Sequence, residues 1–160
     1  MNNLITQYEQ EGRSPKAAIA GLTSEQLNWA PPASANAGAW SIQQVILHIM
    51  DSELIGADRM KRIIAEDNPL ITWWDENRFA QHLGYEQQSV EDAVTLIEIN
   101  RRQFARILRT LKPQAMARTG IHTQTGKITL ESELNKYIWH LNHHLSFVHK
   151  KRELLPKKKP

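Results

Sequence analysis

The sequence contains no cysteine among its 160 residues. This excludes a disulfide framework, catalysis by a thiolate of the chain and zinc sites built from cysteine, so any transition metal must be bound by histidine and carboxylate side chains. No apolar run approaches the roughly 20 residues that cross a bilayer. The first residues, MNNLITQYEQEG, lack the basic and apolar regions of a signal peptide. We therefore expect a cytoplasmic protein without a membrane partner.

The excess of positive charge is confined to one end of the chain. Residues 150–160 hold six of the 20 basic residues and one of the 17 acidic residues, so the rest of the chain has 14 basic and 16 acidic residues. A nucleic-acid binding protein would carry its basic residues on a patch or stripe of the folded domain. We expect no nucleic-acid partner, and we interpret residues 156–160 as a basic tail after a single domain of residues 1–155.

Strand patterns are scarce, and helical periodicity dominates the chain. Four amphipathic helices are predicted, at about residues 3–21, 42–66, 89–111 and 131–155. Shorter elements are expected as a turn starting near Thr23, a short helix at 75–82 and an extended turn at 120–130. The predicted fold class is all-α, an antiparallel four-helix bundle with long second and third connections. Connections longer than about 12–15 residues in a compact domain are usually functional or disordered.

Four of the seven histidines lie in the last predicted helix. On a helical wheel centred on Leu141, His144 lies at roughly −60° and His140 at roughly −100°, next to the apolar stripe. Being four residues apart, they can bind the same ion. His143 lies on the far side and His149 on the opposite flank, which makes His143 at most an accessory residue and His149 a structural or surface one.

A third histidine occupies the same kind of position on another helix. His48 lies at the border of the apolar stripe of the second helix, so three imidazoles could meet inside the bundle around a metal ion. Asp51 lies on the outer side of His48, where it is a candidate proton carrier or a surface charge. Glu53 falls inside the apolar stripe and needs a buried partner, such as an arginine, histidine or tyrosine.

Aromatic residues and one further histidine are candidates for lining a site. Trp40 precedes the N-cap residue Ser41, which suits a hydrophobic staple or a lining position. Trp73 and Trp74 lie in the long second connection, where they could form the wall of a pocket or anchor the loop. His122 lies in the third connection and either covers the site or belongs to a surface turn.

These segments resemble a known family. WSIQQVILHIMDSE, residues 40–53, resembles the helix of DinB/YfiT-like proteins in which Trp-Ser leads to a metal-binding histidine. YIWHLNHHLSFV, residues 137–148, resembles the last helix of the YfiT-like branch. The loop segments NPLITWWDENRFA and IHTQTGKITL are similar to that branch as well, although its usual His-Pro is here His122-Thr123. The similarity extends from about Ser14 to Leu155.

The resemblance implies a fold and a function together. It implies a four-helix bundle of the DinB/YfiT-like type, frequently dimeric, in which His48, His140 and His144 bind one divalent ion, zinc or nickel. The favoured function is transfer of a small bacterial thiol such as bacillithiol to an electrophilic small molecule, through a thiolate activated by the metal. The alternatives are a hydrolase that activates water and a metal-binding protein without catalysis. Asp51 and His143 are the candidate catalytic residues, and Trp40, Glu53, Trp74 and His122 are the candidate pocket residues.

Overall fold

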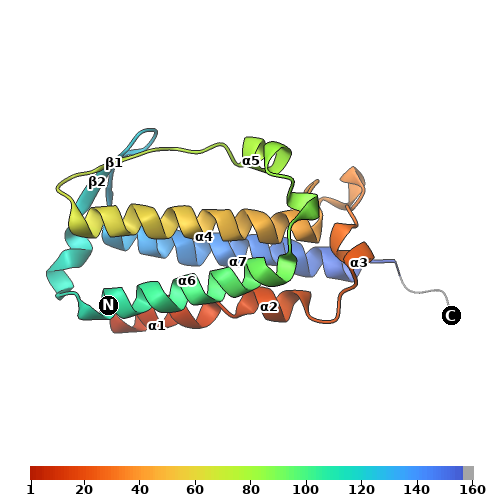
Figure 1. The fold of residues 1–160 in the computed structure, drawn as a ribbon, viewed down its shortest axis with the longest axis horizontal. Coiled ribbons are helices and arrows are strands. Elements are labelled where there is room, and N and C mark those ends of the chain that lie inside the picture. The colour runs from red at the N-terminus through yellow and green to blue at the C-terminus, as the bar shows by residue number, and fades with distance from the viewer. Residues whose placement is uncertain (157–160) are drawn as a thin grey trace.

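Four long helical segments form a bundle, as predicted (Figure 1). The structure is a computed structural model that describes residues 1–156, so most of the predicted basic tail lies outside the described residues. The first segment consists of two helices, and the others are single helices. Their bounds are Asn2–Glu11 (α1), Ser14–Ile19 (α2), Ile42–Ala65 (α4), Val90–Thr110 (α6) and Leu130–Leu154 (α7).

The predicted continuous helix at 3–21 is wrong in one respect, because the chain breaks between α1 and α2. Pro15 stands in the first turn of α2. Its nitrogen carries no hydrogen, so it cannot donate to the carbonyl of Glu11 as a continuous helix would require. Both pieces still pack along the bundle, α1 against α6 and α7, and α2 against the far end of α7.

The four segments are not all antiparallel to their neighbours, because α4 and α6 run in the same direction. Near the start of α4, Gln43 donates to the carbonyls of Tyr85 and Gln88, just before α6. Further along both helices, Arg101 donates to Glu53. The connection from 66 to 89 therefore returns along the whole length of α4 before α6 begins, as Figure 1 shows. It carries strand β1 (Leu70–Ile71) and helix α5 (Glu76–His82), the short helix predicted there.

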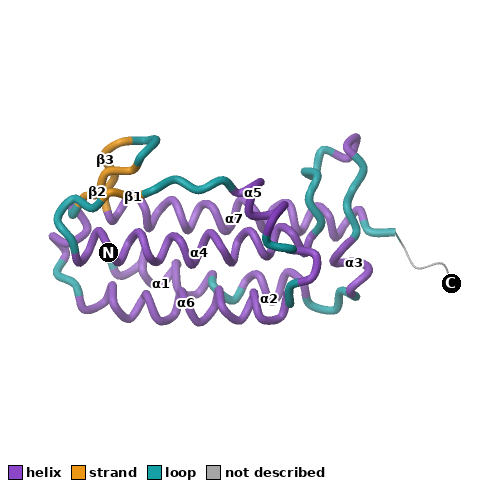
Figure 2. The backbone as a smooth tube through the Cα atoms, turned by 45° about the horizontal axis from the view of Figure 1, so that its top comes forward, coloured by secondary structure: helices purple, strands orange, loops and turns teal. Residues whose placement is uncertain are grey.

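A small sheet, not expected from the sequence beyond an extended turn, closes one end of the bundle (Figure 2). Strand β2 (Thr119–His122) pairs in parallel with β1 and antiparallel with β3 (Gly126–Thr129). Asn68, with a φ of 47°, and Pro69 turn the chain away from α4 into β1. Gly120 allows the sheet to pack on α4, because a Cβ there would lie 3.1 Å from the Ile63 side chain.

The core consists of two apolar clusters with an ionic layer between them. One cluster includes Ile46 and Leu145, and the other includes Met60 and Phe104. Between them Arg101 donates to both carboxylate oxygens of Glu53, at 2.9 and 2.6 Å. This pair is the buried partner that the apolar position of Glu53 required. It fixes the register of α4 against α6.

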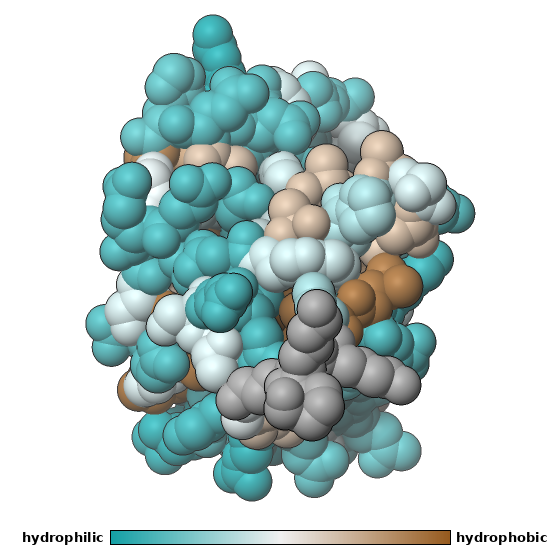
Figure 3. Space-filling view, turned by 90° about the vertical axis from the view of Figure 1, so that its right-hand side faces the viewer, coloured by the Kyte–Doolittle hydropathy of each residue, from teal (hydrophilic) through white to brown (hydrophobic). Residues whose placement is uncertain are grey.

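The remaining short elements lie around the ends of the bundle. They are α3 (Ser24–Asn28), which begins with a capping box at Thr23, and the 3-10 turns Ala33–Ala35, Tyr85–Gln87 and Pro113–Ala117. The end of the bundle near α3 presents a mostly hydrophilic surface with small apolar patches (Figure 3). Within residues 1–156, no helix has the length and apolar character that a membrane span requires.

Candidate metal centre

The structure brings His48, His140 and His144 together between α4 and α7. Ser41 caps α4 and forms a capping box with Gln44, which fixes the start of the helix two turns before His48. The Nε2 atom of His48 lies 3.2 Å from Nε2 of His140 and 3.1 Å from Nε2 of His144. One side-chain nitrogen from each of the three residues lies within 4.8 Å of the others.

Burial keeps all three imidazoles neutral. Burial, and to a lesser extent the neighbouring histidines, lowers the pKa of His48 to about 3, that of His140 to about 2 and that of His144 to about 4. A neutral imidazole has one nitrogen with a proton and one with a lone pair. The Nδ1 atoms of His48 and His140 are buried and have no hydrogen-bond partner among the described residues.

This arrangement fits a divalent cation. Three ring nitrogens that converge cannot all be satisfied by hydrogen bonds to one another, since each neutral ring provides only one donor. Zinc bound to imidazole nitrogen at about 2.0–2.1 Å in tetrahedral geometry places two ligand nitrogens about 3.3 Å apart. The observed separations from His48 Nε2, 3.1 and 3.2 Å, are close to this value. The donor set, three neutral imidazoles without cysteine, suits a first-row transition ion such as zinc, nickel, copper or iron.

Two tryptophans surround His48. The ring centroid of Trp40 lies 5.2 Å from that of His48, and Trp74 stacks on His48 at 5.7 Å with an interplanar angle of 22°. Trp74 also makes an edge contact with Phe79 of α5 at 4.6 Å. The structure therefore places Trp40 and Trp74 in the wall of the site, whereas Trp73 is half exposed. These rings cover His48, which is fully buried, and Trp74 connects the loop before α5 to it.

A carboxylate that the sequence analysis did not single out lies beside the three histidines. The Oε2 atom of Glu76 is 3.7 Å from Nε2 of His48, and its side chain is about half exposed. Asp75 caps α5 by accepting from the backbone N–H groups of Asn77 and Arg78, which fixes the first turn and with it Glu76. The sequence offered only a weak signal, a carboxylate after two tryptophans in a connection long enough to be functional.

The carboxylates predicted on α4 have partners elsewhere. Asp51 accepts a 2.5 Å hydrogen bond from the hydroxyl of Tyr85. Burial raises the pKa of Asp51, and the hydrogen bond from Tyr85 opposes this effect. Glu53 is engaged by Arg101 in the core, so it is not in the wall of the site.

The other predicted histidines occupy different positions. His143 is exposed and stacks on Trp139 at 4.7 Å, on the outer face of α7. His149 is exposed as well. His122 is buried in β2, and its Nδ1 accepts from the backbone N–H groups of Gln124 and Thr125. It lines the same cavity as His140 and directly precedes the turn between β2 and β3.

The comparisons with known proteins agree with this geometry. The family model of the DinB superfamily matches residues 7–148. The chain therefore belongs to the DinB superfamily. A protein of Oceanobacillus iheyensis, named as a candidate metal-dependent hydrolase, is 33% identical over 148 residues, which cover 92% of this chain and 83% of that protein. YfiT of Bacillus subtilis, named in the same way, is 28% identical over 134 residues, 83% of this chain and 73% of YfiT.

A solved structure extends the likeness to the whole fold. YfiT from Bacillus subtilis, described as a probable metal-dependent hydrolase with an unusual four-helix bundle topology, superposes with a TM-score of 0.87 at 26% identity. The superposition covers 96% of this chain and 86% of YfiT. The DinB-type bundle predicted from the sequence is therefore confirmed.

Two cavities of this DinB superfamily protein are each lined by one histidine of the site, and Glu76 and Asn77 line both of them. One, of about 390 Å³, contains His140 together with Trp74 and His122. The other, of about 250 Å³, contains His144 together with Trp40. A larger cavity of about 620 Å³ contains none of the three histidines but shares Trp74 and Arg59 with the first. His140 and His144 therefore line two separate cavities of the site.

Proposed function

We propose that this protein is a metal-dependent hydrolase of small molecules, with one divalent ion held by His48, His140 and His144. The observation that carries the proposal is the convergence of their three Nε2 atoms. The names of the relatives from Oceanobacillus iheyensis and Bacillus subtilis support the reaction class. When bound, a divalent ion of this kind polarises a carbonyl or phosphoryl oxygen and lowers the pKa of water toward 7.

Glu76 is the residue placed to move protons in this reaction. Its carboxylate lies 3.7 Å from Nε2 of His48, and its half-exposed side chain lines both cavities. There it accepts the proton of the attacking water and passes it to the leaving group, the role of a general base and then a general acid. Trp40 and Trp74 orient the substrate and exclude bulk water. Asp51 and His143 are less suited, because one is bonded to Tyr85 and the other faces outward.

A second candidate function is transfer of a small thiol, such as bacillithiol, to an electrophile. The observation that favours it is the pair of cavities, one lined by His140 and the other by His144, which together have room for two reactants. In this reaction Glu76 takes the proton of the thiol, and the sulfur forms a bond to an electrophilic carbon as the leaving group departs with its bonding electrons. A metal-binding protein without catalysis is the third possibility.

One set of measurements separates these functions. The protein is purified without a His-tag, its metal content is measured, and it is assayed against ester, amide, lactam and phosphate-ester panels. Bacillithiol with monochlorobimane provides the transfer assay. Hydrolysis that disappears in His140→Ala supports the proposal, whereas transfer alone supports the second function. Bound metal with neither activity would support a binding protein, and protein without a stoichiometric divalent ion would contradict all three.

A further inference from the structure

Among residues 1–156 two arginines are buried in the bundle, and only one of them forms an ion pair there. Arg101 is fully buried and donates to both carboxylate oxygens of Glu53. Arg59 is 5% exposed, yet no carboxylate among residues 1–156 forms an ion pair with it. It donates to the carbonyl of Thr72 at 2.6 Å and to the hydroxyl of Tyr137 at 3.4 Å, and its Nε has no partner there. A buried charge without a counter-ion is costly.

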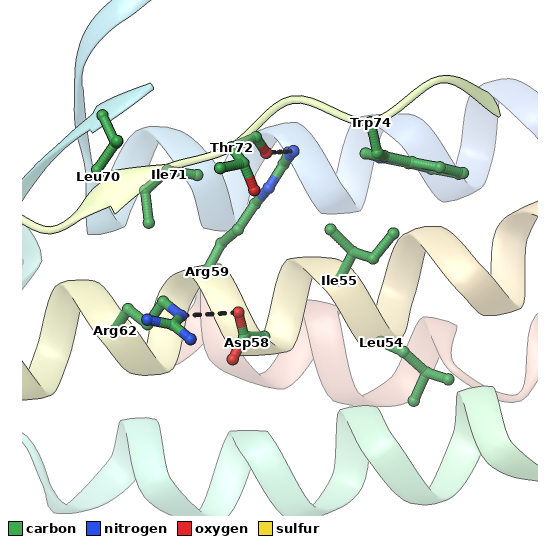
Figure 4. Close-up of a pocket in the computed structure, with 9 residues that line it drawn as sticks. All are labelled: Leu54, Ile55, Asp58, Arg59, Arg62, Leu70, Ile71, Thr72 and Trp74. Atoms are coloured by element: carbon green, nitrogen blue, oxygen red, sulfur yellow. Dashed lines mark hydrogen bonds and ion pairs between the residues drawn. The ribbon is translucent and has the colours of Figure 1, made fainter. Parts of the chain in front are cut away.

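Arg59 lies at the wall of the cavity that contains His140. Its side chain rises from α4 to the segment that crosses above, and its guanidinium reaches the carbonyl of Thr72 (Figure 4). Trp74 lies further along the same segment, while Arg62 and Asp58 pair with each other on the outer side of α4. Arg59 therefore lines both the cavity of about 620 Å³ and the cavity that contains His140.

Two further hydrogen-bond donors line the histidine cavity near Arg59. His122 accepts two backbone hydrogen bonds at Nδ1, so its neutral ring carries the proton on Nε2 as a free donor. Burial, and then the charges of Arg59 and Lys136, lower the pKa of His122 and favour this neutral form. The amine of Lys136 is partly exposed and lies 3.3 Å from Glu133, which leaves further donor capacity.

The carboxylates of the same cavity do not neutralise Arg59. Asp75 is engaged at the N-terminus of α5, and Glu76 lies beside His48. The same cavity is thus lined by the positive charge and donors of Arg59, His122 and Lys136 and by His140 and Glu76 of the candidate metal centre. The planar guanidinium of arginine matches the two oxygens of a carboxylate or a phosphate.

We propose that this cavity selects substrates carrying an oxyanion group, a carboxylate or a phosphate, which binds to Arg59, His122 and Lys136 while the reacting bond faces the three histidines. The proposal rests on the proposed function and names its substrate class. The volume of about 390 Å³ suits a compact molecule. Binding supplies the counter-ion that Arg59 lacks.

The test compares three probes that share a phenyl ring, benzoate, phenyl phosphate and the neutral benzamide, of which benzoate and benzamide match in size. Zinc-loaded full-length protein is titrated with each, and binding is followed in nitrogen–proton correlation spectra. We expect one or both anions to bind at least about tenfold more tightly than benzamide. A tenfold difference in affinity requires only a modest difference in binding free energy. Whichever of the two anions binds more tightly shows whether the cavity prefers a carboxylate or a phosphate. Equal affinity for all three probes would overturn the proposal.

Substitutions separate the subsite from the metal. Arg59→Gln should weaken anion binding at least about tenfold, Arg59→Lys should weaken it less, and the exposed Arg62→Gln should leave it unchanged. An anion bound by the metal alone would bind Arg59→Gln as tightly as the wild type, which would contradict the proposal. If Arg59→Gln does not fold, His122→Phe with Lys136→Gln provides the second variant, with Lys61→Gln as its control. Metal analysis of the same samples reports on the proposed function separately, because anion binding that depends on Arg59 does not require the metal.

Discussion

The Nε2 atoms of His48 and His144 lie 3.1 Å apart, although 96 positions separate the two residues in the chain. They meet because α4 and α7 pack side by side, with Gly56 against Tyr137 and the ionic layer of Glu53 and Arg101 nearby. The candidate metal centre therefore depends on the packing of the bundle as well as on the three histidines. Changes at the site and in the core should have distinguishable effects.

Removing one histidine should remove the metal. His140→Ala leaves only two imidazoles, and we expect tag-free protein to lose most of its divalent ion, as measured by inductively coupled plasma mass spectrometry. His143→Ala, on the same helix but exposed and stacked on Trp139, is the matched control and should retain the metal in full. A His140→Ala protein that retained its ion would show that the three histidines are not the ligand set.

The positions of the three histidines and the burial of Glu53 could be predicted from the helical periodicity of the sequence. The 3.6-residue repeat placed His140 and His144 on one flank of a helix and His48 on the flank of another, and the structure brings these flanks together. Helix positions are local properties, and an apolar stripe identifies the inner face. The predicted burial of Glu53 followed from the same argument, and its partner Arg101 is of a predicted type.

Glu76 and Arg59 were missed because their roles depend on the path of a connection. Residues 66–89 return along the whole length of α4, which makes α4 and α6 parallel. The same connection passes over the histidines. A connection of this length can run along the bundle to its other end or turn back at the end where α4 stops. No pattern in the sequence distinguishes the two paths. The strand β1 was missed for a related reason, since two residues are too few for an alternating pattern.

Glu76→Gln should separate catalysis from metal binding. Glutamine keeps the size of the side chain but cannot accept a proton at neutral pH, so turnover of the substrate found in the panels should fall by about 10²–10⁴-fold. The metal content should stay unchanged, because the three histidines remain. Steady-state kinetics and metal analysis of the same sample check both parts.

Glu91→Gln, an exposed carboxylate in the first turn of α6, is the control for this experiment and should retain full activity. Loss of the metal in Glu76→Gln would identify the carboxylate as a ligand and not as a base. Unchanged turnover would exclude Glu76 from the chemistry.

Breaking the ionic layer should destabilise the fold strongly. Glu53→Gln leaves the buried guanidinium of Arg101 without its counter-ion, and removal of one partner of such a pair costs about 3–5 kcal/mol. Urea denaturation measures this loss. Asp58→Asn, which breaks an exposed pair with Arg62 on the same helix, should cost about 0–1 kcal/mol. Similar losses in the two variants would mean that burial does not set the strength of the Glu53 pair.

Gly56→Ala should destabilise the protein, against the usual effect of this substitution. In an exposed helix, alanine is about 1 kcal/mol more favourable than glycine. Here a Cβ at position 56 would lie 2.3 Å from the Tyr137 ring, so α4 and α7 must separate or the ring must move, at a cost of about 1–3 kcal/mol or more. Urea denaturation gives the sign of the change in the free energy of unfolding. In the double variant Gly56→Ala with Tyr137→Leu, the smaller side chain at position 137 should relieve most of the cost. A stabilised Gly56→Ala protein would contradict the close approach of the two helices.

Asp51→Asn should change how stability depends on pH. Burial raises the pKa of Asp51 above its ordinary value of 3.8, despite the hydrogen bond from Tyr85. The folded state therefore binds this proton more tightly than the unfolded state does. Asp51 contributes stability in full below the unfolded pKa, and this contribution is lost as the pH rises through the folded pKa.

Asparagine stays uncharged and can still accept from Tyr85 through its carbonyl oxygen, so Asp51→Asn lacks this pH-dependent loss. The free energy of unfolding of Asp51→Asn, minus that of the wild type, should therefore increase between about pH 4 and about pH 7. Urea denaturation across this range measures the difference, with Asp67→Asn, whose side chain is fully exposed, as the control. A difference that decreased with pH would show that the hydrogen bond from Tyr85 outweighs burial and that the folded pKa of Asp51 lies below 3.8.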